Sequence, residues 1–185
     1  MKIFKTIFIT FIFLTCSVKA SLNQNLIKTL EEGGKLIFIR HAYAPGSGDP
    51  KNFNLYDCST QRNLNNSGRE QSKKIGILFS KNNIKIKNIF SSEWCRCKET
   101  ADLAFKKFET KKFLNSFYSA KFAKNREKQI KEFKNFINNW DKKGNIIFVT
   151  HYVFISEILN YAPSSGEIII TDNNLNIVDT LETEY

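Results

Sequence analysis

The chain contains two histidines, His41 and His151, and each stands at the end of a run of apolar residues. Arg40 precedes the first histidine, and Arg96 lies between the two in a segment that opens with a pair of serines. An unprotonated imidazole is a nucleophile, and the forked donors of a guanidinium match the oxygens of phosphate. If the fold brings these four side chains together, their natural ligand is a phosphoryl group.

The elements that must position these residues are alternating apolar strands and amphipathic helices. Apolar runs predict strands over residues 35–39, 84–90 and 146–149, and two closing strands near residues 167–171 and 176–180. Helical spacing predicts helices over residues 22–30, 67–82, 125–140 and 153–160, and another that begins near Glu93. Strands that alternate with helices predict an α/β fold in three layers, α/β/α, with a mainly parallel central sheet.

The carboxyl ends of the strands are the expected place of the site, because ligands bind outside these ends in open parallel sheets. Three dipeptides stand at such ends: Arg40-His41, Ser91-Ser92 and Thr150-His151. A helix that starts near Ser92-Glu93 would add free N–H groups, which favour an anion. Residues 42–66 are irregular, and a loop of this length inside a compact domain is usually functional or disordered.

Four segments carry recognisable motifs, in an order that spans most of the chain after residue 20. They are Arg40-His41-Ala42, Arg62-Asn63-Leu64 with Gly68-Arg69-Glu70-Gln71, the block from Ser91-Ser92 through Arg96 to Thr100-Ala101, and Val149-Thr150-His151. In this order they resemble the histidine phosphatase superfamily, formerly grouped with phosphoglycerate mutases. The first segment is a version of that family's Arg-His-Gly motif, and the last resembles the segment of its second histidine.

The resemblance implies a phosphoglycerate mutase-like fold in which His41 attacks phosphorus to form a phosphohistidine, which water then hydrolyses. Arg40, Arg96 and His151 would hold the equatorial oxygens and stabilise the charge that spreads during transfer. No metal or other cofactor is required, and the partner is a small phosphorylated substrate. Three further residues are candidates for substrate binding: Arg62, Ser92 and Glu93. The alternatives are a structural ion pair for Arg62 and an ordinary helix-start acid for Glu93.

Two departures from the family pattern bear on activity. Ala42 replaces the usual glycine, which the chain accepts only if φ is negative there. Many members supply a carboxylic acid as proton donor before the second histidine, and residues 113–126 contain none. The candidates elsewhere are Asp49, Asp57, Glu93 and Glu167. Some relatives need no dedicated acid when the leaving group is good, so its absence points to phosphohistidine, phosphoanhydride or other activated substrates.

Two other functions compete with a phosphatase. A non-catalytic phosphate- or phospholigand-binding domain on the same fold is consistent with Ala42 and the missing acid. A phosphoglycerate mutase of central metabolism is disfavoured, because it needs that acid and because export would separate it from its substrates.

The first twenty residues predict a signal peptide, residues 1–20, that is cleaved near Ser21. Lys2 and Lys5 provide the positive start, residues 7–14 are apolar except for one threonine, and small residues precede the cleavage point. The apolar run is shorter than the roughly 20 residues of a spanning helix, so the mature protein is not expected to cross a membrane. Cys16 raises a minor lipoprotein alternative. We therefore expect a periplasmic or secreted protein with a single domain, residues 21–185.

Export also changes how the cysteines are interpreted, because an oxidising compartment permits disulfides. Cys58, Cys95 and Cys97 remain after cleavage. Cys95 and Cys97 point to different sides of a helix and do not bridge each other comfortably. Cys58 is expected to pair with one of them, which leaves one free thiol. Zinc is a poor alternative, since three cysteines lack the spacing of a metal site.

The mature chain is basic, with a net charge near +7 once the three lysines of the signal peptide are removed. The lysines are scattered, without a basic tail or a nucleic-acid motif. A solvated basic surface explains this distribution, and no nucleic-acid partner is expected.

Overall fold

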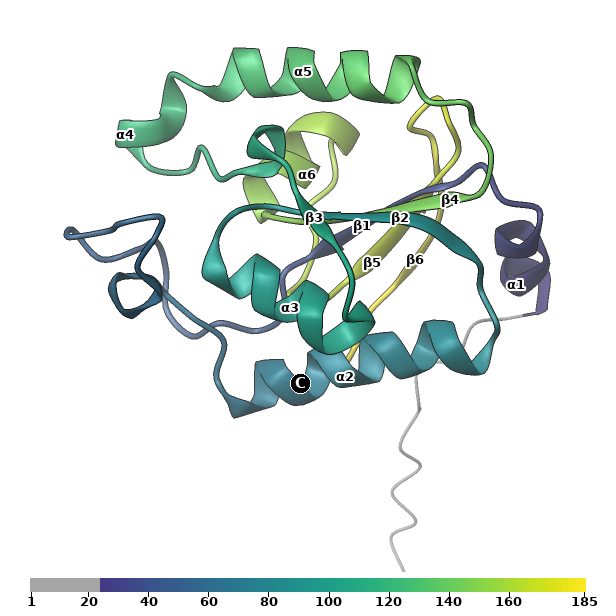
Figure 1. Cartoon of the computed structure of the whole chain (residues 1–185), viewed down its shortest axis with the longest axis horizontal. Helices are drawn as coiled ribbons and strands as arrows, with labels where there is room; N and C mark the ends of the chain where they lie inside the picture. Colours follow the sequence, from purple (N-terminus) through teal and green to yellow (C-terminus); the bar gives the residue numbers. More distant parts are fainter. Residues whose placement is uncertain (1–23) are drawn as a thin grey trace, which may run out of the picture.

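A computed structural model of the protein describes residues 24–185 (Figure 1). The predicted signal peptide, residues 1–20, lies outside the described residues. Within the described part, no helix combines the length and the apolar character that crossing a membrane requires.

The described residues form one six-stranded sheet in the order β3-β2-β4-β1-β5-β6. Its strands are β1 (Leu36–Arg40), β2 (Ile86–Ser91), β3 (Glu109–Thr110), β4 (Asn145–Thr150), β5 (Ile168–Thr171) and β6 (Ile177–Leu181). The pairs β3·β2, β2·β4 and β4·β1 are parallel, whereas β5 and β6 add antiparallel pairs. The predicted mainly parallel sheet is confirmed. β5 and β6 run antiparallel to each other, because the short turn between them cannot make a parallel crossover.

Helices cover both faces of this sheet, as the three-layer prediction requires (Figure 1). They are α1 (Gln24–Glu31), α2 (Asn66–Lys81), α3 (Cys95–Phe105), α4 (Ala120–Ala123), α5 (Arg126–Asn138) and α6 (Tyr152–Leu159), with 3-10 turns η1 (Cys58–Thr60) and η2 (Lys112–Leu114). α2 and α3 lie on one face, and α5 and α6 lie on the other. β3, η2 and α4 were not predicted; all three fall between residues 109 and 123.

The alternation of side chains along β1 divides the core into two halves, because successive residues of a strand point to opposite faces. Ile37 and Ile39 pack in the half formed with α2 and α3. Leu36 and Phe38 pack in the half formed with α5 and α6. All four side chains are fully buried, and each contributes about 1.5–3 kcal/mol through burial. This packing holds β1 in place, and with it the residues at its carboxyl end.

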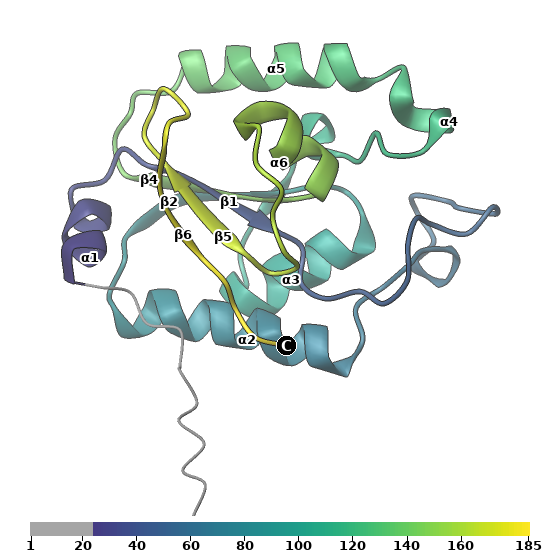
Figure 2. The ribbon, with the colours of Figure 1, turned by 180° about the vertical axis from the view of Figure 1, so that it is seen from behind.

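Two glycines of α2 allow close backbone contacts that other residues would block. A Cβ on Gly76 would lie 2.2 Å from the carbonyl oxygen of Ala104 in α3, and one on Gly68 would lie 2.0 Å from that of Tyr43. α2 therefore packs directly on α3 and on the segment after His41. Seen from behind, the chain leaves β6 and ends over α2 (Figure 2), where the ring of Tyr185 stacks 4.2 Å from that of Tyr43.

The long loop of residues 42–66 is attached to α3 by a disulfide. Of the two pairings that the sequence allowed, the structure contains Cys58–Cys95, with the Cα atoms 5.7 Å apart. Cys97 is a buried free thiol, and burial raises its pKa to about 12. The side-chain oxygen of Gln61 also accepts the N–H of Cys95 at 2.9 Å. The loop therefore has a defined position at the start of α3.

Replacing both cysteines of this disulfide, Cys58→Ser with Cys95→Ser, is expected to lower the free energy of unfolding by about 4 kcal/mol, because the bridge closes a loop between residues 37 positions apart. Urea unfolding of the variant and the wild type measures the difference. Thiol labelling of residues 21–185 provides the control: the wild type should react once in urea, at Cys97, and not when folded. Three reactive thiols in non-reducing urea would contradict the pairing.

Candidate active site

Three neighbouring strands deliver the candidate residues to one cavity. His41 follows β1, Ser92 follows β2 and His151 follows β4, and these three strands are adjacent in the sheet. Arg96 lies in the first turn of α3. The four predicted catalytic residues, Arg40, His41, Arg96 and His151, all line a cavity of about 350 Å³. The convergence predicted from the sequence is present in the fold.

The ring of His41 is fixed in one tautomer. Its Nδ1 lies 2.8 Å from the carbonyl oxygen of Ala42, which can only accept, so Nδ1 donates. Nε2 carries the lone pair and accepts a hydrogen bond from Nε of Arg96 at 3.1 Å. Burial and the nearby Arg96 charge lower the pKa of His41 well below 6.5. His41 is therefore neutral near pH 7, with an unprotonated Nε2 at the cavity.

Ala42 fits the position in which the family has glycine. It is fully buried and is not among the residues with positive φ, so its Cβ causes no backbone strain. Its N–H donates to Oγ1 of Thr100 at 3.0 Å. The replacement leaves the carbonyl that anchors His41 in place.

The second histidine is oriented by a chain of hydrogen bonds from Asn115. Oδ1 of Asn115 accepts the backbone N–H of Glu93 at 2.8 Å, and its Nδ2 donates to the Glu93 carboxylate at 2.7 Å. Ser92 must therefore donate its single hydroxyl proton to Oδ1 of Asn115, at 3.1 Å. Nε2 of His151, 2.9 Å from that hydroxyl, then has to be the donor. The neutral His151 thus carries its lone pair on Nδ1.

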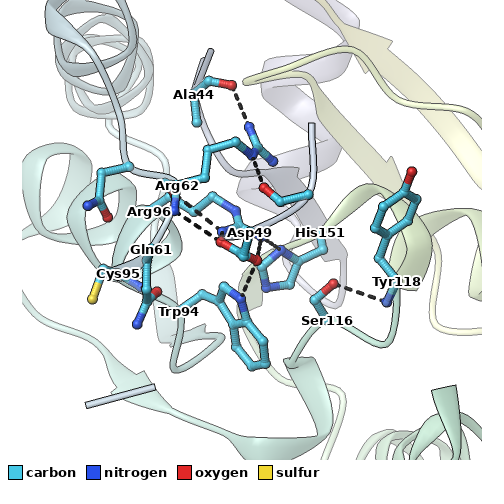
Figure 3. Close-up of polar contacts among 12 residues, drawn as sticks. Ala44, Asp49, Gln61, Arg62, Trp94, Cys95, Arg96, Ser116, Tyr118 and His151 are labelled. Atoms are coloured by element: carbon cyan, nitrogen blue, oxygen red, sulfur yellow. Dashed lines mark hydrogen bonds and ion pairs between the residues drawn. The ribbon is translucent and has the colours of Figure 1, made fainter. Parts of the chain in front are cut away.

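Arg96 uses all five of its N–H donors. Its Nε–H points to Nε2 of His41 and one Nη2–H to Nδ1 of His151, at 3.1 and 3.4 Å. The end of the fork is paired with Asp49, through Nη1 at 2.7 Å and Nη2 at 3.3 Å (Figure 3). The remaining Nη1–H reaches the carbonyl of Arg62 at 3.3 Å. One edge of the guanidinium therefore faces both histidines, while the carboxylate holds the other.

Among the described residues, Asp49 is the one carboxylate that lines the cavity. Burial alone would raise its pKa, but the charge of Arg96 and the hydrogen bonds from Arg96, Arg62 and Trp94 outweigh that effect and lower it. The backbone N–H of Arg62 and the indole N–H of Trp94 each donate to it at 3.1 Å (Figure 3). Asp49 is therefore an ionised partner of Arg96, and a poor proton donor at neutral pH.

Arg40 retains an unused donor at the cavity. Its Nη1 donates to the carbonyl of Pro163 at 2.9 Å, and its guanidinium lies 5.5 Å from the ring centre of Tyr152. Its Nε is buried without a hydrogen-bond partner among the described residues. Burial lowers the pKa of Arg40 from 12.5, which leaves the group charged at neutral pH.

Arg62 lines the cavity, and its guanidinium shapes the loop. It donates to the carbonyl of Gly48 at 2.8 Å and, in a short hydrogen bond, to that of Ala44 (Figure 3). No carboxylate of the described residues pairs with its side chain, so the structural ion pair considered for it is not formed. Its contacts instead fold residues 44–49 so that Asp49 reaches Arg96.

The substrate-binding roles predicted for Ser92 and Glu93 find no support in their positions, because neither side chain lines the cavity. Ser92 is buried against His151, and the carboxylate of Glu93 accepts from Asn115. The helix start was also expected to offer free N–H groups to an anion. α3 begins later, at Cys95, and the N–H groups of residues 93–95 already donate to the side chains of Asn115, Ser92 and Gln61.

The other candidate acids are directed elsewhere. Asp57 is exposed and caps η1 through the N–H of Ser59. Glu167 is buried and accepts from Tyr161 and from the N–H of Ser164. Across residues 24–185, no three His, Cys, Asp or Glu side chains are grouped closely enough to hold a metal ion.

Acid should destabilise the protein through the two buried histidines. Burial lowers the pKa of His41 and His151 well below 6.5, with the Arg96 charge adding to the effect. Below pH 6.5 the unfolded chain binds protons that the folded protein does not. The free energy of unfolding is therefore expected to fall by up to about 1.4 kcal/mol per pH unit for each histidine, until the pH reaches the folded-state values.

Urea unfolding at pH 7.5, 6.5 and 5.5 measures this slope. The variant His41→Asn with His151→Asn should flatten it, because asparagine does not titrate. A wild-type stability that rises as the pH falls from 6.5 to 5.5 would contradict the buried neutral state. Asp49 contributes in the same direction at lower pH, since its stabilisation is lost as the pH falls through its lowered folded pKa.

Two contributors to the site carried no sequence signal. Asn115 fixes His151 but stands in a segment without periodicity, and Gln61 reaches α3 from an irregular loop. The pairing of Asp49 with Arg96 also depends on the path of that loop. Asp49 lies within a Gly-Ser-Gly-Asp-Pro sequence, which is typical of a turn but does not determine the path of the loop.

Residues 36–143 match the family model of the histidine phosphatase superfamily (branch 1). No curated protein sequence matches the chain significantly. Among solved structures, the putative phosphohistidine phosphatase SixA from Agrobacterium tumefaciens is similar with a TM-score of 0.56 and 16% identity, over 80% of this chain and 97% of that one. The protein TTHB049 from Thermus thermophilus gives 0.56 and 14%, over 80% and 98%. The protein histidine phosphatase SixA complexed with tungstate gives 0.52 and 13%, over 80% and 96%. At these identities the likeness concerns the fold.

Proposed function

Because the chain belongs to the histidine phosphatase superfamily, we propose that it is a phosphatase that hydrolyses a phosphoryl group through a phosphohistidine on Nε2 of His41. The observation that carries this proposal is the state of His41. Its Nδ1 is anchored to the carbonyl of Ala42, and its free Nε2 lies beside Arg96. A neutral, oriented imidazole next to a guanidinium is what attack on an anionic phosphoryl group requires.

In the first step, the lone pair on Nε2 of His41 attacks phosphorus, and the bond to the leaving group breaks on the opposite side. The Nε–H and Nη2–H of Arg96, which point to the two histidines in the free protein, turn to phosphoryl oxygens. The unused Nε–H of Arg40 provides a further donor. These groups stabilise the negative charge that spreads over the equatorial oxygens.

His151 is proposed to take up a proton as the substrate binds. In the free protein its Nδ1 carries no proton, and burial, together with the nearby arginines, lowers its pKa. A phosphoryl group brings negative charge into the cavity, which favours the charged imidazolium. Nδ1–H can then donate to a phosphoryl oxygen, while Nε2–H keeps its contact with Ser92. In the second step, water attacks phosphorus, the P–N bond breaks, and phosphate leaves with the protons of that water.

The leaving group has to depart without help from a strong acid of the cavity. Asp49 is the only carboxylate that residues 24–185 bring to the cavity, and its pKa is lowered by its partners. This favours activated substrates, whose leaving groups need no proton, over simple phosphomonoesters. The name of one structural neighbour, the protein histidine phosphatase SixA, refers to an activated substrate of this kind.

Asp49 is proposed to act as a positioning residue. Asp49→Asn is expected to lower kcat roughly 10–100-fold with a smaller change in KM, because the amide cannot hold both ends of the Arg96 fork. Asp49→Glu should recover part of kcat, since it restores the charge. Steady-state kinetics of both variants test this role. An unchanged or increased kcat in Asp49→Asn would contradict it and would favour a carboxylate that competes with the substrate.

Turnover of acetyl phosphate and p-nitrophenyl phosphate by residues 21–185 tests the proposed function, with a His41 variant as the reference. Equal background rates for both proteins would contradict the proposed phosphatase activity. Binding of phosphate without turnover would then favour the alternative, a phosphate- or phospholigand-binding domain.

We further propose that the protein acts outside the cytoplasm, in the periplasm or after secretion. The Cys58–Cys95 disulfide supports this, because such bridges persist in oxidising compartments. The mass of the protein purified from its cells tests it: a chain that starts near Ser21 is expected, and a retained Met1 would contradict export.

A further inference from the structure

We propose that the substrate is a nucleotide with a chain of at least two phosphates, from which His41 removes the terminal phosphoryl group. This inference rests on the proposed function and concerns the part of the cavity that the phosphoryl group does not fill. Four observations carry it: the size of the cavity, its two lysines without a carboxylate partner, its aromatic wall and the lack of an available acid among its described residues.

The cavity is larger than a phosphoryl group needs. Arg40, His41, Arg96 and His151 form one part of a space of about 350 Å³, which is in the range of small-molecule sites. The rest is lined by residues of the 42–66 loop and of the segment before and within α4. These segments lie on the same side of the molecule in both ribbon views (Figures 1 and 2). A substrate with a sizeable group beyond phosphorus fits this space.

The charge of the cavity exceeds what one phosphoryl group would balance. Of the described residues, five cationic side chains and one carboxylate line the cavity. The carboxylate, Asp49, is already paired with Arg96. Lys51 and Lys121 come from the two opposite segments and make no hydrogen bond or ion pair with the described residues; the Lys121 ammonium lies 5.5 Å from the ring centre of Phe122. Ammonium groups without a carboxylate partner, on both sides of the cavity, suit a second anionic group next to the transferred one.

Aromatic rings line the same outer part. Phe53, Trp94 and Phe122 pack together, with ring centres 5.0–5.5 Å apart. Tyr118 and Tyr152 are 64% and 43% exposed. The Tyr118 ring has no aromatic or hydrogen-bonding partner among the described residues, and it lies across from Asp49 (Figure 3). An exposed, planar ring beside a cationic site is a platform on which a nucleobase can stack.

The chemistry of a phosphoanhydride agrees with these features. When Nε2 of His41 attacks the terminal phosphorus, the bond to the bridging oxygen breaks, and its electron pair leaves with the shortened nucleotide. That leaving group is a stable anion and needs no proton, so the absence of an available acid is no obstacle. Lys51 and Lys121 lie where they can balance its charge. Water then releases phosphate from His41.

The test compares four compounds with the wild type: ADP, AMP, pyrophosphate and acetyl phosphate. Acetyl phosphate is activated but has neither a second phosphate nor a ring. We expect kcat/KM for ADP to exceed that for AMP at least 100-fold and that for pyrophosphate at least 5-fold. Lys51→Ala with Lys121→Ala should lower kcat/KM at least 10-fold for ADP and less than 3-fold for acetyl phosphate. Tyr118→Ala should reduce it for ADP and leave pyrophosphate unchanged.

The matched control is Lys131→Ala with Lys134→Ala, which removes the same charge from exposed positions of α5 that do not line the cavity; it should leave all four rates unchanged. The proposal is overturned if AMP is hydrolysed as well as ADP, or if the cavity lysines affect ADP and acetyl phosphate equally. His41-dependent hydrolysis of acetyl phosphate without preference for ADP would contradict the nucleotide substrate and leave the proposed phosphatase activity standing. Absence of turnover for every compound would overturn the phosphatase as well.

Discussion

The His41→Asn variant is expected to lose phosphatase activity by roughly 10⁴-fold or more, because it removes the nucleophile. Asparagine is close in size to the near part of histidine, and its amide N–H can keep the hydrogen bond to the carbonyl of Ala42. It cannot form a covalent bond to phosphorus. Initial rates with acetyl phosphate and p-nitrophenyl phosphate measure the loss.

Two further measurements separate a missing nucleophile from a damaged fold. The wild type, mixed with substrate and quenched in base, should contain a phosphohistidine that mass mapping assigns to His41, and the variant should contain none. Phosphate should still bind the variant within about tenfold of the wild type, since Arg40 and Arg96 remain. A variant that retains a tenth of the wild-type rate, with the same fold, would show that the reaction does not pass through His41.

The four central residues could be predicted because each is attached to a recognisable element. Arg40 ends the apolar strand β1, His41 follows it and His151 follows β4, and hydrophobic runs are a strong local signal. Arg96 lies in the first turn of α3, the helix that the sequence predicts from near Glu93. This prediction did not require the order of the strands, since the carboxyl ends of parallel strands share one edge of the sheet.

The segment between α3 and α5 could not be predicted, for a physical reason. β3 has two residues and η2 and α4 are each a single turn, so none shows a repeating hydrophobic pattern. Their positions come from tertiary contacts. Gln129 of α5, for example, donates to the carbonyls of Lys112 and Asn115. These contacts place Asn115 beside Ser92, which in turn orients His151.

The roles of residues in loops could not be predicted from the sequence either. Asp49 could be named from the sequence only as a possible acid, because its pKa depends on which side chains the folded loop brings to it. The contacts with Arg96, Arg62 and Trp94 make it an ionised partner instead. Conversely, Glu93 stood next to the motif in sequence, yet the later start of α3 turns it towards Asn115. A position next to a strand end in the sequence therefore predicts the site residues that the strands carry, and not the roles of residues in loops.

Arg96→Lys is expected to lower kcat/KM roughly 10²–10³-fold, although it preserves the charge. Arginine contacts His41, His151 and the Asp49 carboxylate at the same time from one planar group. Lysine is a point charge whose position is set by its strongest partner, which here is the carboxylate. The donors aimed between the two histidines would then be lost, and with them the contacts to the phosphoryl oxygens.

The pair with Asp49 determines how this loss divides between binding and chemistry. The Arg96 and Asp49 side chains are only 4% and 16% exposed, so breaking their pair also costs stability, of the order of 3 kcal/mol. Thermal unfolding and kinetics of Arg96→Lys, Asp49→Asn and the double variant form a cycle that isolates the coupling. If Asp49 acts only through Arg96, the double variant should have the kcat of Arg96→Lys alone. Additive losses would mean that Asp49 affects catalysis by a separate route, and a kcat/KM of Arg96→Lys within threefold of the wild type would exclude the guanidinium from the transition state.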